Sequence, residues 1–272
     1  MEAPIIHDEL WTLSEPLLPP TKPRRKEHPG RPRVSDRAVL NGILFVLTTG
    51  LRWNHLPTVL GFSSGATCWR RLNDWRKAEV WDRLHELLLD TLREAGQIDL
   101  SYAAVDSSSV RTVGAGGKTG PNPTGRARPG SKHPILVDAN GVPISPILTG
   151  ANRNDVTQLL PLVDAIPPIR GARGRPLQRP KVIYADRGYD SDPHRQRLRE
   201  RGIKPVIARR RTEHGRGLGK FRWVVERTHS WLHNFRRLRI RFDRRADIHE
   251  AFFKFGCALA CWNIFRRTEQ SF

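Results

Sequence analysis

Two aspartates stand at the ends of short apolar segments that predict β-strands. Asp106 follows Ala103 to Val105, and Asp186 follows Ile183 to Ala185. A carboxylate at the end of a buried strand costs free energy unless it is paired or binds a metal. One such Asp is usually a helix cap or an ion-pair partner, but two on separate strands of one sheet favour a shared site. Short, rigid oxygen ligands of this kind suit Mg²⁺.

Glu226 is the candidate for a third ligand. Residues 221–232 have a helical pattern, and helix geometry places Glu226 about 100° from Val225, at the rim of the apolar stripe. Alone, this Glu would be an ordinary surface residue paired with Arg222 one turn earlier. The setting favours a metal-binding role over this simple one, because residues 195–247 hold 18 basic and 5 acidic side chains. Metal-held carboxylates beside phosphate-binding arginines are the groups that phosphodiester chemistry needs.

Composition restricts the partners. The 272 residues carry a formal charge of +20, and 38% are hydrophobic, which excludes a disordered chain. So basic a protein needs an anionic counter-surface, and nucleic acid is the first candidate. No apolar run is long enough for a membrane span. The N-terminal residues lack a signal-peptide pattern, and the three cysteines make neither a disulfide framework nor a zinc site. We therefore expect a cytoplasmic protein with no membrane partner.

The apolar pattern changes near residue 99. Residues 1–98 predict three or four short helices, with Ser35 and either Ser63 or Ser64 as N-caps. They suit a helix-turn-helix DNA-binding domain, and an assembly module is the alternative. Residues 99–272 predict the order β-ββ-α-β-α-β-α-α, an α/β domain with a hairpin at Asn140-Gly141. The Gly- and Pro-rich residues 112–131 predict no regular structure, and residues 221–238 predict one helix.

Other polar residues near these elements have simpler interpretations. Four acids are excluded from the metal site because they predict helix caps, turn residues or favourable charges at a helix start; they are Asp138, Asp155, Asp190 and Asp192. Arg187 and Arg222 are candidates for contacts to phosphates of the cut strand, and a salt bridge to a nearby carboxylate is the alternative for each.

Motifs along nearly the whole chain resemble those of the DDE transposases of bacterial insertion sequences, in the group numbered four/five. They are Asp106-Ser-Ser-Ser-Val-Arg, Gly130-Ser-Lys-His-Pro, Ala151-Asn-Arg-Asn-Asp155, Tyr184-Ala-Asp186-Arg-Gly-Tyr189 and Arg222-x-x-x-Glu226. The resemblance implies a ribonuclease-H-like mixed sheet flanked by helices and preceded by an all-α, helix-turn-helix-like domain. It implies Asp106, Asp186 and Glu226 as catalytic ligands of two Mg²⁺ ions, with Mn²⁺ as a substitute, and makes Ser107 to Ser109 loop or supporting residues.

The resemblance has two departures at its C-terminal signature. The family often has Tyr three residues before the Arg and Lys or Arg seven residues after the Glu, where this chain has Gly219 and His233. Lys220 and Arg236 stand nearby as substitutes. The predicted DNA-binding residues are Arg187, Lys220, Arg222, His233, Arg236 and Arg237.

The implied reaction cuts a donor strand with water and joins the 3′-OH to target DNA. The expected partners are double-stranded DNA, as terminal inverted repeats and as target. Because two element ends must be cut, we expect a homodimer or larger oligomer, associated with the nucleoid. A metal-dependent nuclease or resolvase of the same fold, which would not transfer strands, is the alternative.

Overall fold

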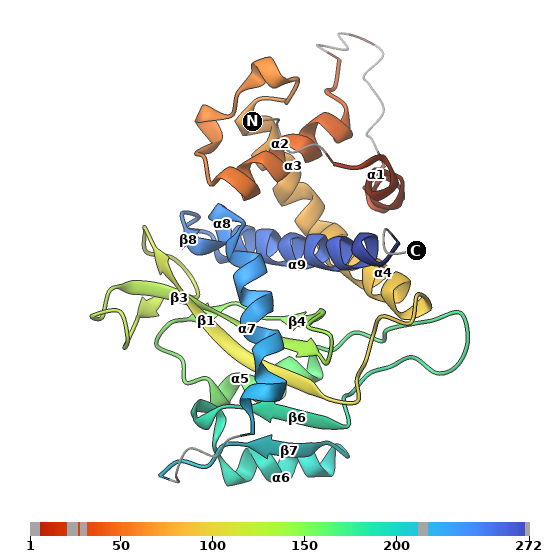
Figure 1. The fold of residues 1–272 in the computed structure, drawn as a ribbon. Helices are drawn as coiled ribbons and strands as arrows, with labels where there is room; N and C mark the ends of the chain where they lie inside the picture. Colours follow the sequence, from red (N-terminus) through yellow and green to blue (C-terminus); the bar gives the residue numbers. More distant parts are fainter. Residues whose placement is uncertain (1–5, 21–26, 28–31, 212–216, 270–272) are drawn as a thin grey trace.

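The N-terminal part of the chain is a set of helices (Figure 1). The computed structural model describes residues 6–20, 27, 32–211 and 217–269. The elements here are α1 (Asp8–Ser14), η1 (Glu15–Leu17), α2 (Asp36–Thr49), η2 (Trp53–His55), η3 (Thr58–Leu60), α3 (Gly65–Lys77) and α4 (Val80–Glu94). Ser35 caps α2, accepting from the Ala38 N–H at 3.2 Å, and Ser64 caps α3, accepting from the Thr67 N–H at 3.3 Å. The predicted caps are confirmed, and Ser64 is the one of the two serines that acts.

The following residues form an eight-stranded mixed sheet. Its strands are β1 (Ala103–Thr112), β2 (Gly120–Pro121), β3 (Pro129–Asp138), β4 (Pro143–Pro146), β5 (Thr149–Gly150), β6 (Val182–Ala185), β7 (Lys204–Ile207) and β8 (Ile240–Arg241). The order is β2-β3-β1-β6-β7, with β4 and β5 on β3 and β8 on β1. β3 runs antiparallel to β1 and β4, whereas β6 and β7 run parallel to β1. This is the ribonuclease-H-like arrangement that the motifs implied.

Five helices cover the sheet and link it to the N-terminal bundle. They are α5 (Val156–Asp164), α6 (Asp192–Glu200), α7 (Gly219–His233), α8 (Arg236–Arg239) and α9 (Ala246–Glu269). Figure 1 shows α7 crossing β1, and α9 lying between the bundle and the sheet. Within the described ranges, every helix falls short of the length and apolarity that a bilayer crossing requires.

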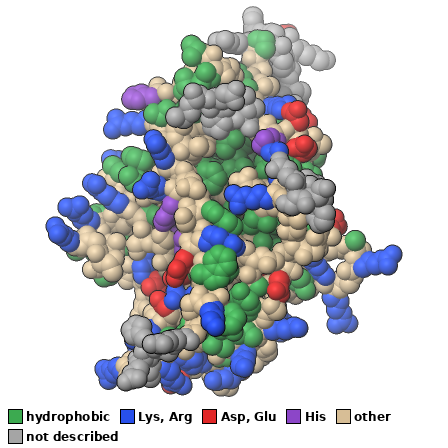
Figure 2. Space-filling view, viewed as in Figure 1, with side chains coloured by type: hydrophobic (Ala, Val, Ile, Leu, Met, Phe, Trp, Pro, Cys, Tyr) green, Lys and Arg blue, Asp and Glu red, His purple; other side chains and the backbone are tan. Residues whose placement is uncertain are grey.

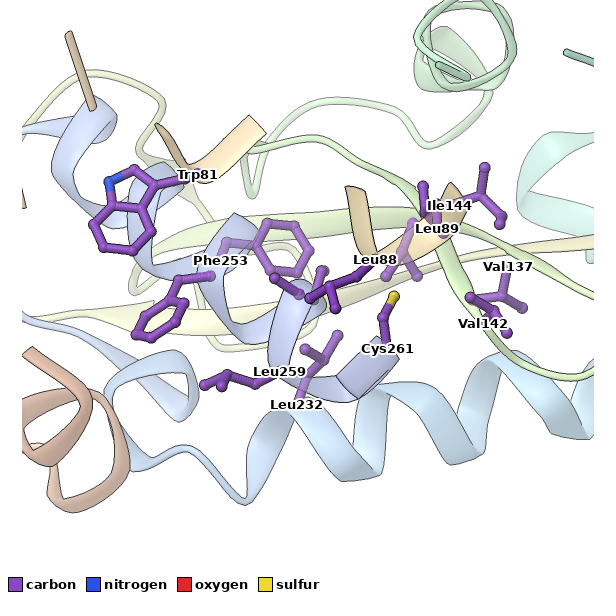
Figure 3. Packing of buried hydrophobic residues seen from close by; sticks show 14 of the residues in the cluster. Trp81, Leu88, Leu89, Val137, Val142, Ile144, Leu232, Phe253, Leu259 and Cys261 are labelled. Carbon is purple, nitrogen blue, oxygen red and sulfur yellow. The ribbon is translucent and has the colours of Figure 1, made fainter. Parts of the chain in front are cut away.

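One apolar core joins the two parts of the chain. The Trp81 ring of α4 lies 4.8 Å from the Phe255 ring of α9, measured between centroids. Leu88 of α4, Val137 of β3 and Phe253 of α9 belong to the same buried cluster (Figure 3). The two predicted domains, 1–98 and 99–272, therefore share a core through α9, and their division into separate units stays a prediction.

Three local predictions are wrong. Ser107 to Ser109 were expected to be loop or supporting residues; the loop alternative is wrong, because they continue β1 and their main chain pairs with Pro134 to Lys132 of β3. Residues 112–131 contain the paired strand β2 and the first residues of β3, despite their Gly and Pro content. The helix expected over residues 221–238 is two helices, interrupted at Asn234 and Phe235.

The shared core predicts a stability difference between two substitutions. Phe253 is fully buried, so Phe253→Ala should lower the free energy of unfolding by about 3–5 kcal/mol. Val59 is 92% exposed, so Val59→Ala should change it by less than about 0.5 kcal/mol. Urea denaturation of both variants measures this, and similar values for the two would contradict the assigned core.

Candidate active site

The parallel pairing of β1 and β6 places two predicted metal ligands, Asp106 and Asp186, side by side in the sheet. Ala103 pairs with Ile183 and Ala104 with Tyr184. Continuing that register by two residues sets Asp106 beside Asp186, and neighbouring strands lie about 4.8 Å apart. Asp106 sits in the middle of β1 and is opposite Ile135 of β3 on its other side. The sheet therefore places the two aspartates as neighbours.

Asp186 begins a tight turn directly after β6. It is the N-cap of η4 (Arg187–Tyr189), and its Oδ1 accepts a hydrogen bond from the Gly188 N–H at 2.8 Å. A Cβ at Gly188 would lie only 2.9 Å from that oxygen, so the close approach requires glycine. The Asp-Arg-Gly-Tyr sequence is thus a turn that fixes the Asp186 carboxylate at the strand end.

Glu226 comes to the site from α7. Val224 and Val225 are buried against the sheet, while Glu226 is exposed, which confirms its predicted position at the rim of the apolar stripe. Glu226 and Asp106 line one hollow of about 560 Å³. Figure 2 shows acidic side chains beside basic and apolar ones on the surface in front of α7. The helix thus carries a third carboxylate to the edge of the site.

Electrostatic coupling links the three carboxylates. The pKa of Asp106 is raised from 3.8 to about 6, mainly by burial and to a smaller extent by the negative charges of Asp186 and Glu226. The Ser107 N–H, which donates to Asp106 Oδ1 at 2.8 Å, and the Arg222 guanidinium lower it. Arg222 Nη2 lies 3.4 Å from Asp106 Oδ2. Asp106 therefore stands in an excess of negative charge that one arginine offsets only in part.

The donor set fits a divalent cation in its chemistry. Three carboxylates that repel one another suit a hard, oxygen-preferring ion, which would take the place of Arg222 as the partner of Asp106. In the part of the chain that the structure describes, no three His, Cys, Asp or Glu side chains are arranged to hold a metal together. Asp106 and Asp186 instead direct oxygens at Arg222, Ser107 and Gly188.

The predicted DNA contacts divide into exposed and buried residues. Lys220 and Arg236 are exposed, and Arg187 is half-buried. Arg237 corrects its prediction, because its side chain is 3% exposed and its Nη2 lies 3.0 Å from Asp243 Oδ1. It also donates to the Leu51 carbonyl, so it fastens α8 to the N-terminal helices and does not face DNA.

His233, where the family often has a basic residue, lies inside the site. Its Nε2 is 3.2 Å from the Ser108 hydroxyl, and it lines the same hollow as Asp106 and Glu226. Burial, and secondarily the charge of Arg239, lowers the pKa of His233 below its ordinary value of 6.5. The imidazole is therefore neutral near pH 7 and does not supply the positive charge of a Lys or Arg.

The four excluded acids have structural partners. Asp138 closes the Asn140-Gly141 turn by accepting from the Asn140 and Val142 N–H groups, at 2.9 and 2.7 Å. Asp190 pairs with Arg195, and Asp192 begins α6. Asp155 precedes α5 but makes no side-chain cap, and its Oδ1 lies 2.9 Å from Lys132 Nζ. Asp155 thus occupies the N-cap position that was expected, but its side chain pairs with Lys132 and does not cap the helix.

Two buried residues beside the acids escaped the sequence analysis as part of the site. Tyr189 is 1% exposed, and burial and the charges of Asp155, Asp106 and Asp186 raise its pKa well above 10. His229 is 8% exposed and lines the hollow beside Asp106. The Tyr189 hydroxyl lacks a hydrogen-bond partner among the described residues, whereas burial lowers the pKa of His229 to about 4 and a hydrogen bond with the main chain of Asp106 opposes that shift. In the sequence, the one indication for either residue was that His229 lies three positions after Glu226, on the same side of the predicted helix.

The strand order and the helices that flank the sheet define a class, the ribonuclease-H-like proteins. Residues 99–262 match the family described as "Transposase DDE domain", and the chain belongs to that family. Residues 6–85 match "Putative transposase of IS4/5 family". The resemblance found in the sequence motifs is confirmed.

Relatives agree with this assignment. A Burkholderia cepacia protein, "Putative transposase for insertion sequence element IS402", is 77% identical over 154 residues, 57% of this chain and 73% of the relative. "Insertion element IS402 uncharacterized 16.2 kDa protein", from the same organism, is 69% identical over 123 residues, 45% of this chain and 84% of the relative. A Neisseria meningitidis serogroup B protein, "Transposase for insertion sequence element IS1106", is 27% identical over 212 residues, which are 65% of this chain and 68% of the relative.

A solved structure, "Crystal structure of the Mos1 Strand Transfer Complex", is 14% identical and has a TM-score of 0.29. The match covers 87% of this chain and 81% of the chain in the solved structure. A score this low does not establish a common fold, which here rests on the strand order and the family match.

The raised pKa of Asp106 predicts a stabilising substitution. The folded chain binds the Asp106 proton more tightly than the unfolded chain, so ionisation costs stability as pH rises from about 4 to 6. Without divalent metal, Asp106→Asn should therefore raise the free energy of unfolding at pH 7 by on the order of 2 kcal/mol. The gain should fade below pH 6 and vanish below pH 4.

Denaturation in EDTA at pH 4 to 8 measures this difference. Asp74→Asn is the matched control for the substitution itself, because Asp74 is exposed on α3. An Asp106→Asn variant no more stable than the unsubstituted chain at pH 7 would contradict the crowding of charge at the site.

Proposed function

We propose that this transposase cuts the ends of its insertion sequence and joins the resulting 3′-OH to target DNA, with Asp106, Asp186 and Glu226 as its catalytic residues. The observation that carries the proposal is the gathering of three carboxylates at one place: burial, and then the charges of Asp186 and Glu226, raise the pKa of Asp106 above its ordinary value. Stability alone gives no reason to gather three acids in a protein of charge +20. A site for cations on a phosphodiester substrate does give one.

Two Mg²⁺ ions, or Mn²⁺ in their place, are the proposed occupants of these carboxylates. Divalent metals are expected for the family, and the number of ions is part of the proposal. When bound, such ions would make water a stronger nucleophile and stabilise the charge that develops on the phosphate. The chain's contribution is to hold the oxygens of Asp106 and Asp186 on adjacent strands and to bring Glu226 to them on a helix packed against the core.

The basic side chains around the acids would orient the DNA. Arg222 would exchange Asp106 for a strand phosphate once metal neutralises the carboxylates. Lys220 and Arg236, which are basic residues near Arg222 in the sequence, are exposed. Arg187 follows Asp186 directly, which puts its main chain at the site. These residues would hold the phosphate to be cut in line with the attacking oxygen.

The partners follow from the same proposal. Terminal inverted repeats and target are both double-stranded DNA, and residues 1–98 would bind DNA or assemble the complex. Cutting two element ends calls for a homodimer or larger oligomer. The place of action would be the bacterial cytoplasm, at the nucleoid. A nuclease of the same fold would cut and not join, so strand transfer from a pre-cut end separates the two.

Asp106→Asn, Asp186→Asn and Glu226→Gln should each lower Mg²⁺-dependent cleavage and strand transfer by about 100-fold or more, because each removes a ligand charge. DNA binding should stay within about threefold, since the rest of the basic surface is unchanged. Glu200→Gln, an exposed acid at the end of α6, is the control and should act like the unsubstituted chain. Full activity in any of the three would remove that residue from the site.

DNA affinity should fall steeply with salt, because each phosphate that Lys or Arg neutralises releases counterions. With about six such contacts, affinity should drop roughly 1,000-fold between 50 and 200 mM NaCl. Fluorescence anisotropy on a labelled duplex gives the slope. A flat response would mean that the basic surface is not the DNA contact.

A further inference from the structure

A half-buried ion pair lies behind the catalytic acids, on the face of the sheet that points away from α7. Lys132 Nζ is 2.9 Å from Asp155 Oδ1, and the two side chains are 13% and 29% exposed. We propose that Asp155 is a fourth acid of the cation site, which acts through its charge from behind Asp186 and not as a ligand. Lys132 is its built-in counter-ion and limits the negative charge that the site presents to divalent metal. This inference rests on the proposed function, because it takes the three catalytic acids to bind cations.

Strand register fixes the side from which Lys132 approaches. The main chain of Lys132 on β3 is opposite Ser109 on β1, so their side chains share a face of the sheet. The neighbouring Ser108 contacts α7, and side chains alternate between the two faces of a strand, so Ser109 and Lys132 point away from α7. The ammonium meets Asp155 on that side, where it also donates to the Arg153 carbonyl at 3.0 Å.

Asp155 lies against the turn that holds Asp186. A Cβ placed on Gly188 would be 2.9 Å from Asp186 Oδ1 and 3.8 Å from Asp155 Oδ2, so the two carboxylates approach the same side of that glycine. Asp155 is in the N-cap position of α5, but its side chain does not cap the helix. Because α5 packs against η4, the carboxylate is held beside the Asp186 turn and not on its own helix.

The charge of Asp155 reaches the same space as the charges of the catalytic aspartates. Tyr189 is 1% exposed, and its hydroxyl has no hydrogen-bond partner among the described residues. Its pKa is raised well above 10, first by burial and then by the charges of Asp155, Asp106 and Asp186, in that order of effect. A cation drawn to Asp106 and Asp186 therefore also lies within the field of Asp155.

Lys132 offsets that fourth charge. An ammonium 2.9 Å from a half-buried carboxylate attracts it and makes the pair neutral as a whole. Four uncompensated acids would bind divalent ions more tightly than three do, and phosphate oxygens would then compete less well for the same ions. The pair thus gives the site an immobile carboxylate beside Asp186 without a free fourth ligand.

The alternative is a purely structural pair that joins β3 to α5. The two roles predict different results when the partners are removed one at a time. Losing either partner of a structural pair should disturb the cation site in the same direction. If the pair sets the charge of the site, losing Asp155 and losing Lys132 should change cation affinity in opposite directions.

Mn²⁺ binding to the full-length chain without DNA, measured from the electron paramagnetic resonance of the free ion, tests this. Asp155→Asn should weaken binding by about fivefold, because the site loses a negative charge, and Lys132→Met should tighten it by about threefold, because Asp155 loses its counter-ion. The double variant should stay within about twofold of the unsubstituted chain, since both charges of the pair are gone. Lys132→Arg, which keeps the charge, should also bind as the unsubstituted chain does.

Lys118→Met and Glu250→Gln are the matched controls. Lys118 Nζ lies 2.9 Å from Glu250 Oε2, so these substitutions break a similar pair and change the net charge by the same amounts. Glu250 is on α9, however, and not on an element that holds one of the acids. Each control should leave Mn²⁺ affinity within about twofold of the unsubstituted chain, because distant exposed charges are screened.

Unchanged affinity in both single variants, or shifts of Asp155→Asn and Lys132→Met in the same direction, would overturn the proposal. If one single variant does not fold, the double variant decides, because it must bind Mn²⁺ more tightly than Asp155→Asn and more weakly than Lys132→Met.

Asp106→Asn and Asp186→Asn separate this inference from the proposed function. If they abolish Mn²⁺ binding while the Asp155 and Lys132 variants leave it unchanged, the catalytic acids stand and only the role of the pair is wrong. If the unsubstituted chain binds no Mn²⁺, or these two variants bind it as well as that chain does, the proposed function fails, and the inference fails with it.

Discussion

The crowding of buried negative charge at Asp106 is the constraint around which this protein is built. Asp106 is largely buried, next to Asp186 and within the field of Glu226, and Arg222 approaches it with positive charge. Such an arrangement is unfavourable in the free chain and favourable with a cation bound. The surrounding structure must therefore supply the stability that the site lacks, and it must keep the three side chains near one another without collapsing them onto basic neighbours.

The surrounding core meets that requirement. α7 is fixed to the sheet by buried valines and by Thr228, whose hydroxyl donates to the Gly141 carbonyl at 2.6 Å, so Glu226 cannot drift away from Asp106. α9 connects the sheet and α7 to α4 through the contact between the Phe255 and Trp81 rings. Helix α7 carries Glu226 and, one turn later, Ser230, and both side chains line the hollow beside Asp106.

Several parts of the fold were predictable because their causes are local. Ser35 and Ser64 cap helices with their own side chains, and Asn140-Gly141 turns the chain with Gly141 at a φ of +81°. Strand β6 ends at Ala185, directly before Asp186, as its apolar run predicted. Predictions were wrong where distant partners decide. The three serines after Asp106 are polar enough for a loop, yet pairing with β3 extends the strand through them.

By itself, the sequence determined which acids are candidates, that the chain is basic enough to bind DNA, and which family it belongs to, because these depend on residue types and short spacings. Tertiary structure alone decided three other things: that register makes Asp106 and Asp186 neighbours, that Arg237 is buried against Asp243, and that His229 is buried beside Asp106. Each depends on which distant segments pack together. Burial and strand register arise from long-range contacts, which no short stretch of residues specifies.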